Sequence, residues 1–231
     1  GLPQFLAEGG TFSMVLDFPV MRSSTYLERL SSWLGAKKGW GIAVLNFGHH
    51  SIENYIKDHV DSSDPNRYYE LYERYLASYQ RQGIYEVAWG NVFIRRLPKN
   101  HPGFAVERYM VNPYVAMEGL VEGWLQALTR FSSPQWAPEW DSDRPRRTPW
   151  VQDMWLNHKG DKGIVEFAQA GWSSPMQLPG EAVRLLSMLT GRATLASVAQ
   201  RWAKRRKLDV EAAREQIRAM LITLGISLLW Q

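Results

Sequence analysis

Three short apolar runs, separated by helical segments, constrain the fold of this chain more than any other feature. They are Thr11–Phe18, Gly41–Phe47 and Ile84–Leu97. Nearly continuous apolar runs of this length are typical of strands covered on both faces, and their alternation with helices favours a mostly parallel sheet. Three strands alone leave an unpaired apolar edge. We therefore expect a missing N-terminal half, or another chain, to pair along that edge.

The segments between these runs carry helix signals. Ser23 or Ser24 can cap a helix that ends at Gly35, and Asp64 can cap a second helix with Pro65 at its first position. The second helix, which ends at Gly83, has tyrosines along one side, and such a stripe indicates a packed face rather than a ligand site. The tyrosines are Tyr68, Tyr72, Tyr75 and Tyr79.

The rest of the chain divides into a middle segment, 98–178, and a C-terminal segment, 179–231, after a first domain of residues 1–97. In the middle segment we predict a strand over Phe104–Val111 that pairs with the preceding strand, a helix over Val115–Phe131 and an exposed loop over Ser132–Pro149. A hairpin of Trp150–Asn157 with Ile164–Ala170 follows.

The C-terminal segment predicts three helices and a short strand. The helices are Glu181–Leu189, one capped by Thr194, and one capped by Asp209 that stops at Gly225. Ile226–Trp230 is apolar enough to form a terminal strand. Three helices with a short strand make a small module of the winged-helix type.

Composition excludes some classes of site. The chain has no Cys, which rules out disulfides, thiolate metal ligands and cysteine nucleophiles and fits a reducing compartment. No apolar stretch is long enough for a membrane span, and Gly1-Leu2-Pro3-Gln4 does not begin a signal peptide, so a cytoplasmic protein is expected.

The positive charge is concentrated near the C-terminus. Residues 180–231 hold nine Lys or Arg against four Asp or Glu, so this segment carries +5 and the first 179 residues carry −1 of the total of +4. The run Lys204-Arg205-Arg206-Lys207 lies at a predicted helix end. In a winged-helix module such a run makes nucleic-acid phosphates candidate partners, and the alternative is a module that grips a protein substrate.

The order of elements resembles the C-terminal half of class I S-adenosylmethionine-dependent methyltransferases. In that Rossmann-like fold a helix runs into a Gly-Gly turn and a fifth strand, similar to Leu6–Val15, and the last strand is antiparallel to the rest. More narrowly, the chain resembles bacterial methyltransferases of the small-domain type with a C-terminal extension. Their helix-Gly-strand run ending in two Arg is similar to Tyr75–Arg96, and their closing module is similar to the stretch that begins at Leu189–Leu195.

The resemblance implies a cofactor site that this chain does not carry. Such enzymes hold S-adenosylmethionine through a Gly-rich loop after the first strand and an acidic residue after the second, and bind a substrate nitrogen through an Asn-Pro-Pro motif. None of these motifs occurs here, and Gly9-Gly10 is a turn. We therefore assign no cofactor residue, and expect that this chain alone does not bind the cofactor. The implied methyl acceptor is a nitrogen of a protein, a nucleic acid or a small molecule.

Ligands of parallel α/β sheets bind beyond the carboxyl ends of the strands. Asp17 follows one predicted strand, and Asn46, His49 and His50 follow the next, which makes these four the substrate-side candidates. Either histidine could relay a proton, although a solvated or capping role is the simpler interpretation. With Glu53 they do not complete a metal-ligand pattern, so no metal is expected. A turn-forming Asp17 before Pro19 is the simpler alternative there. The second function class that the sequence allows is a non-catalytic winged-helix module that binds nucleic acid or a protein.

Overall fold

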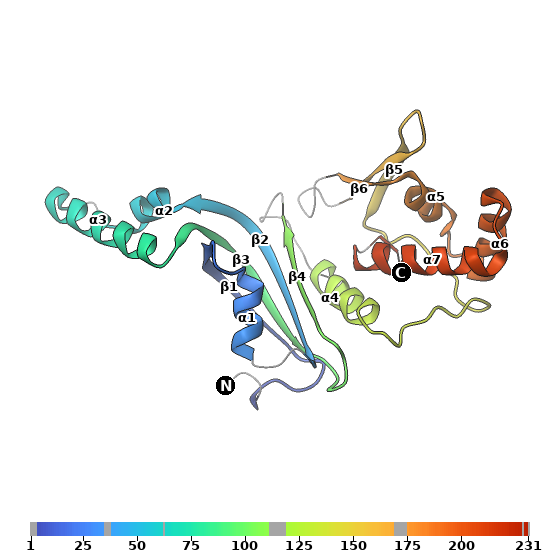
Figure 1. The fold of residues 1–231 in the computed structure, drawn as a ribbon, viewed down its shortest axis with the longest axis horizontal. Helices are drawn as coiled ribbons and strands as arrows, with labels where there is room; N and C mark the ends of the chain where they lie inside the picture. Colours follow the sequence, from blue (N-terminus) through green and yellow to red (C-terminus); the bar gives the residue numbers. More distant parts are fainter. Residues whose placement is uncertain are drawn as a thin grey trace. The chain divides into compact units, whose positions relative to one another are not determined.

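The computed structural model describes residues 4–34, 38–61, 63–110, 119–168, 175–227 and 229–230. They form two compact units, residues 1–110 and residues 111–231, each described here by itself (Figure 1). The segment 98–178 that the sequence sets apart is thus divided between the two units. The fold class is mixed α/β, with a mixed sheet in the first unit and an antiparallel sheet with helices in the second.

The first unit is built on a four-stranded sheet with the order β1-β3-β2-β4. Its strands are β1 (Thr11–Met21), β2 (Trp40–Ser51), β3 (Ile84–Arg96) and β4 (Phe104–Tyr109). All three predicted strands are present, and two of them are longer than predicted. β1 continues through Pro19, which the edge position of the strand tolerates, and β2 continues through His49 and His50.

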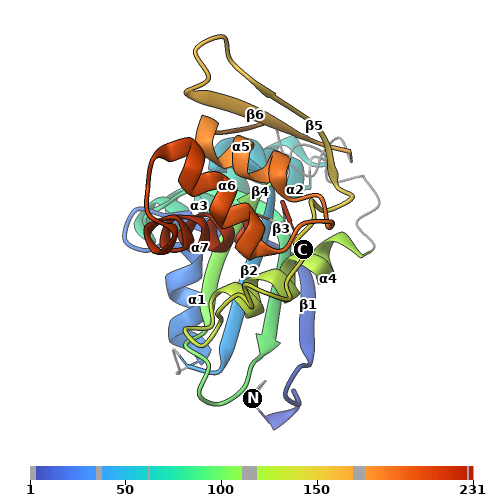
Figure 2. The same ribbon diagram turned by 90° about the vertical axis from the view of Figure 1, so that its right-hand side faces the viewer.

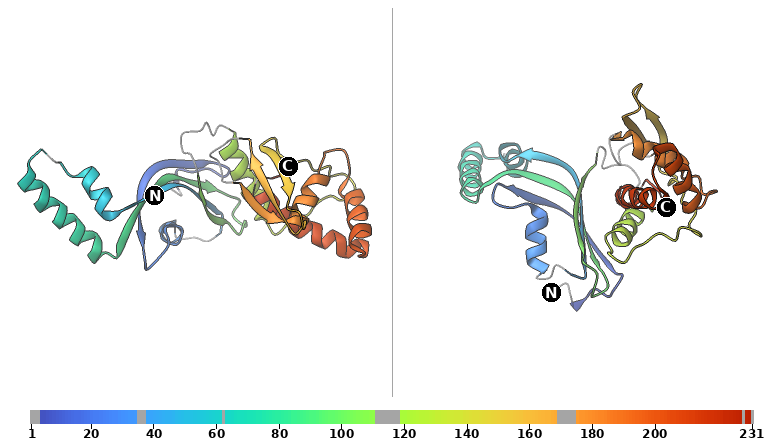
Figure 3. Two further views of the ribbon diagram at one scale, coloured as in Figure 1. Left: turned by 90° about the horizontal axis from the view of Figure 1, so that it is seen from above. Right: turned by 45° about the vertical axis from the view of Figure 1, so that its right-hand side comes forward.

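The sheet is mixed, because β3 runs antiparallel to both of its neighbours while β4 pairs in parallel with β2. The mostly parallel sheet predicted from the alternation of apolar runs and helices is therefore wrong, whereas the antiparallel direction of the third strand agrees with the expectation from the resemblance. The cause lies in α2 (Ile52–His59) and α3 (Pro65–Arg81), which pack on one another instead of crossing the sheet. The two helices stand at one end of β2 and β3 (Figures 1 and 3). The chain therefore re-enters the sheet at the end it left, and β3 must run in the opposite direction.

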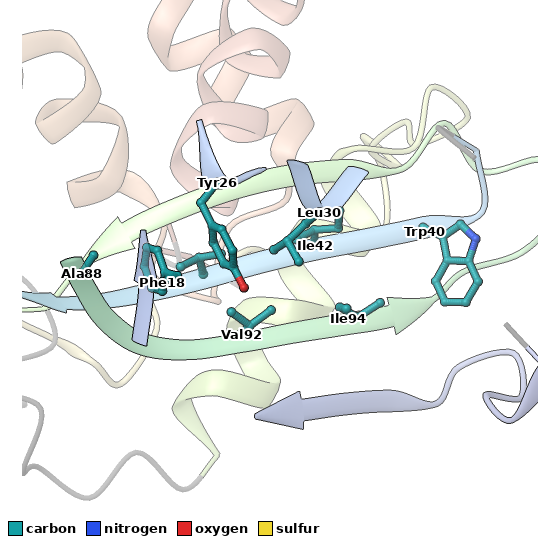
Figure 4. Close-up of a cluster of buried hydrophobic side chains, with 9 residues drawn as sticks. Phe18, Tyr26, Leu30, Trp40, Ile42, Ala88, Val92 and Ile94 are labelled. Carbon is teal, nitrogen blue, oxygen red and sulfur yellow. The ribbon is translucent and has the colours of Figure 1, made fainter. Parts of the chain in front are cut away.

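α1 (Tyr26–Leu34) lies on the sheet, and its Tyr26 and Leu30 side chains belong to the buried core drawn in Figure 4. Tyr26 stacks on Phe18 with ring centroids 4.3 Å apart. Thr25, rather than the predicted Ser23 or Ser24, caps the helix: the backbone N–H of Glu28 donates to its Oγ1, while the Glu28 carboxylate accepts from the N–H of Thr25. The cluster comprises Phe18, Tyr26, Leu30, Trp40, Ile42, Val44, Ala88, Val92 and Ile94.

β4 pairs in parallel with β2, whereas the sequence predicted that Phe104–Val111 pairs with the preceding strand. Both edges of β3 are already occupied, by β1 on one side and β2 on the other. The only open position for a fourth strand on that side is therefore the far edge of β2.

The tyrosine stripe of α3 is a packing face, as predicted, except at one position. Tyr68, Tyr72 and Tyr79 pack against a second cluster formed by Ile52, Ile56, Val60 and Ile84. Tyr75 is 48% exposed. Asp64 caps α3 as predicted, and its carboxylate accepts from two backbone N–H groups.

The second unit joins a three-stranded antiparallel sheet to helices (Figure 2). The predicted hairpin is confirmed as β5 (Val151–Leu156) with β6 (Lys162–Phe167), and a third strand, β7 (Met176–Pro179), pairs with β6. Thr194 and Asp209 cap the two helices predicted to begin there. The helices are α4 (Leu120–Phe131), α5 (Gly180–Met188), α6 (Leu195–Arg206) and α7 (Val210–Ile226).

Two predictions for the second unit are wrong. α7 continues through Gly225 to Ile226. This glycine lies against the Phe131 ring, where a side chain would collide, so it serves helix packing and does not end the helix. The predicted terminal strand is a single bridge between Trp230 and Arg147. Residues 111–118, where the predicted helix of Val115–Phe131 begins, lie outside the described residues. None of the helices in the described ranges is long and apolar enough to cross a membrane.

We expect Gly90→Ala to destabilise the first unit strongly. A Cβ at residue 90 would collide with the carbonyl oxygen of Leu45, so β2 and β3 would have to separate locally. Overpacking of this kind should lower the free energy of unfolding by about 3 kcal/mol in urea titration. Ser13→Thr, which adds a methyl group at an exposed position of the same sheet, is the control and should change the free energy by less than about 0.5 kcal/mol. Equal effects of the two variants would contradict this packing argument.

Candidate functional site

Asn46 organises a polar group at the carboxyl end of β2. Its side chain is 1% exposed, and the Oδ1 atom accepts from the backbone N–H of Gly48 at 3.0 Å. Because a backbone N–H can only donate, this bond fixes the orientation of the amide. The Nδ2 atom then donates to Glu107 Oε1 at 2.7 Å and faces His49 Nε2 at 2.8 Å.

The same bonds determine the tautomer of His49. Asn46 Nδ2 belongs to an amide NH2 group, which can only donate a hydrogen bond. His49 Nε2 must therefore accept, and the ring proton lies on Nδ1. Nδ1 donates to Glu86 Oε2 at 2.9 Å. His49, with 26% of its side chain exposed, therefore presents the lone pair of Nε2 to the Asn46 amide and is oriented by a carboxylate at its Nδ1.

The register of the strands places this group on one face of the sheet. His49 pairs with Ala88, which also pairs with Phe18 of the α1-covered core. Asn46 pairs with Tyr109, whose ring lies 5.7 Å from that of His49 in a stacked arrangement. The ends of β2 and β4 and the start of β3 thus bring together Asn46, His49, Glu86, Glu107 and Tyr109.

The sequence analysis missed Glu86, Glu107 and Tyr109. A signal was present, because each glutamate is a charged residue inside a predicted strand. The β-bulge between Asn46 and Gly48, which the sequence did not reveal, places His49 on the same face as Asn46 and so brings it to these residues.

Asp17 belongs to a different group. It pairs with Trp89, one residue out of step with Ala88, so it lies on the opposite face from His49. Its carboxylate accepts from the Tyr55 hydroxyl at 2.9 Å. Burial, followed by the hydrogen bond to Asp17, raises the pKa of Tyr55 to about 12. The Tyr55 ring in turn stacks on His59 with centroids 4.0 Å apart.

The four predicted residues are therefore split. Asn46 and His49 come together, Asp17 binds Tyr55, and His50 is exposed in register with Val87. His49 and His50 lie within β2 rather than after it, because the strand extends to Ser51. Within the described residues, no group of three His, Cys, Asp or Glu side chains could hold a metal ion.

The described residues do not fit a nucleotide-type cofactor at the Gly9-Gly10 turn. The N–H of Gly9 donates to the carbonyl of Arg96, and the carbonyl of Gly10 accepts from the N–H of Arg96. These backbone groups are already hydrogen-bonded to Arg96 at the end of β3, so they are not available to bind a ligand. We therefore assign no step of chemistry to a cofactor held there.

A hollow of about 890 Å³ in the first unit lies elsewhere. It opens beside α1, between Glu28 and Ser31 of the helix and Phe104 at the start of β4. Asn46 and the other polar residues of the group described above are at the opposite ends of the strands and do not line it.

Comparison with known proteins leaves the family of this chain open. No family model and no curated protein matches it. A solved structure, the PqqD truncation of Methylobacterium extorquens PqqCD, described as a stand-alone RiPP recognition element, is 22% identical. The match covers 39% of this chain and 90% of that one, with a TM-score of 0.32. A likeness at this level carries no functional argument.

We expect Asn46→Ala to lower the free energy of unfolding by about 1–3 kcal/mol, because it leaves the N–H of Gly48 without its acceptor and His49 without its donor. Urea denaturation measures the change. His50→Ala, at an exposed position of the same strand, should shift the free energy by less than about 0.5 kcal/mol. If both variants unfold at the wild-type urea concentration, the amide does not organise this group.

The Tyr55 phenol should ionise near pH 12. Ultraviolet difference spectroscopy, with Tyr55→Phe as the reference for the wild type, measures this ionisation. A raised pKa means that the folded state favours the neutral phenol. Its stabilisation is complete below about pH 10, the ordinary value, and is lost as the pH rises through 12. In Asp17→Ala the pKa of Tyr55 should fall but stay above the ordinary value, since burial is the largest cause. An unchanged pKa in that variant would exclude the Asp17 contact.

Proposed function

We propose that this chain is the distal part of an S-adenosylmethionine-dependent methyltransferase and supplies the substrate side of its site. One observation carries the proposal. β3 is antiparallel to both neighbours, while β1 and β2, which it separates, run parallel to each other and are linked by α1. For β1, β2 and β3 this agrees with the resemblance drawn from the sequence, in which the last strand of a Rossmann-like sheet runs against the rest. β4, which follows β3 and pairs in parallel with β2, is an additional strand.

The free edge of the sheet supports the same proposal. β1 is the terminal strand, and none of the described strands pairs with its outer side. Val15 of this strand is 74% exposed and Phe12 is 37% exposed. An edge with apolar side chains is a site of strand pairing, and the proposed cofactor-binding half of the sheet would cover it.

The group around His49 is suited to activate a nitrogen nucleophile. In a methyltransferase the cofactor supplies an electrophilic methyl group, and the acceptor nitrogen must lose a proton. His49 Nε2 has the lone pair to take that proton when the acceptor replaces the Asn46 amide. Glu86 then stabilises the resulting imidazolium through the Nδ1–H bond.

The C-terminal module is the proposed partner-binding part of the protein. A three-stranded sheet followed by three helices supports a winged-helix-like assignment, and Lys204, Arg205, Arg206 and Lys207 are all exposed at the end of α6. Arg206 pairs with Glu181. A nucleic acid or a protein is the candidate partner of this run, and a binding module without catalysis is the second candidate function.

The decisive experiment compares the complete gene product with this 231-residue chain. Calorimetry with S-adenosylhomocysteine should detect binding to the complete product only. The complete product is then incubated with tritiated S-adenosylmethionine and with protein, RNA and small-molecule fractions of the source cells. Label should enter one fraction, His49→Ala should slow its entry about 100-fold or more, and the control His50→Ala should leave it within about twofold.

Two results would overturn the proposal. A complete gene product that binds no S-adenosylhomocysteine favours the non-catalytic binding module. Tight binding by the 231-residue chain alone would contradict the assignment of the cofactor site to residues outside it. If binding holds and His49→Ala keeps the wild-type rate, the methyltransferase stands and the role given to His49 falls.

A further inference from the structure

The second unit contains a hollow of about 580 Å³ whose polar lining is basic. Three arginines, Arg146, Arg147 and Arg192, contribute to its wall, and no carboxylate is among the described residues that line it. Thr148 and Thr190 add hydroxyl groups, and Val151 and Leu189 add apolar surface. The hollow lies where the loop before β5 meets the turn after α5.

The backbone around this hollow is fixed from two sides, although the sequence predicted only an exposed loop here. The N–H of Arg147 donates to the carbonyl of Leu189 at 3.1 Å, and the N–H of Thr148 donates to that of Leu229 at 3.2 Å. The N–H of Gly191 donates to the carbonyl of Pro145 at 3.0 Å. These hydrogen bonds therefore fix the backbone positions of the arginines in the loop relative to the arginine in the turn.

Gly191 keeps the wall closely packed. Its φ of 75° suits glycine, and a Cβ at this residue would lie 3.3 Å from that of Arg146. Arg144 lies next to the hollow, and its Nη1 donates to the carbonyl of Arg192 at 2.8 Å. Four arginines thus gather within one short stretch of surface.

Like charges held around one hollow repel each other, and an anion between them removes the repulsion. A guanidinium presents parallel N–H donors that match the two oxygens of a carboxylate or phosphate. The Thr190 hydroxyl supplies a further donor, and none of the described residues that line the hollow carries an aromatic ring on which a nucleobase could stack. We propose that Arg147 and Arg192 form an oxyanion-binding site for the carboxylate or phosphate group of a small molecule, with Val151 and Leu189 against its apolar part.

The site is separate from the basic run at residues 204–207 and independent of the proposed methyl transfer. No residue of that run lines the hollow. The run therefore provides a matched control, because the double variant Lys204→Ala with Arg205→Ala removes the same two charges from exposed residues of the same unit.

The test is calorimetric titration of the chain at low salt with pyrophosphate and, separately, with citrate. At least one probe should bind the wild type, and Arg147→Ala with Arg192→Ala should weaken binding about 10-fold or more. Lys204→Ala with Arg205→Ala should change it by less than about twofold, as expected for exposed charges outside the hollow. Tighter binding of pyrophosphate would identify phosphate as the preferred group, and tighter binding of citrate would identify carboxylate.

Circular dichroism of each variant checks that it folds. If the double alanine variant does not fold, the double variant Arg147→Lys with Arg192→Lys is used in its place. The lysine pair keeps the charge but loses the parallel donors, so it should bind the probe more weakly than the wild type. Failure of both probes to bind the wild type would overturn the proposal. Equal weakening by the alanine pair and by Lys204→Ala with Arg205→Ala would do the same, because binding would then depend only on net charge.

Discussion

The first unit depends on the pairing of β3 along both of its edges. β1 lies on one side of it and β2 on the other, both antiparallel, so every residue that the sheet positions is placed relative to β3. The close approach of β3 to β2 at Gly90 leaves no room for a side chain. Just beyond it, the bulge after Asn46 turns the end of β2, and the polar group around His49 follows from that turn.

The periodicity of the sequence could predict the position of β3 but not its direction, which only the resemblance to methyltransferases suggested. The position of the strand was legible, because Ile84–Leu97 is long, rich in β-branched and aromatic residues and bounded by Gly83. Its direction depended on whether the helices before it crossed the sheet. That is a property of how α2 and α3 pack on each other, and no periodicity of a single segment encodes it. The partner of β4 escaped prediction for the same reason.

The candidate site was half predictable. Asn46 and His49 were found because polar residues after a buried strand mark its carboxyl end. Glu86 and Glu107 were missed because they are 37 and 61 residues away from the side chains they contact. Asp17 was grouped with Asn46 and His49 but lies on the opposite face of the sheet, since a shift of one residue along a strand moves a side chain to the other face. Helix caps were the most reliable signals: Asp64, Thr194 and Asp209 all act through bonds local to the sequence.

The hairpin of α2 and α3 leaves the sheet and returns to it at one end. Its length is therefore independent of the spacing of the strands. A helix that crosses a sheet must match the strand it spans, whereas this excursion could gain or lose whole turns without displacing β2 or β3. The hairpin beside His49 and Glu86 can accordingly vary in length between related proteins without moving these two residues.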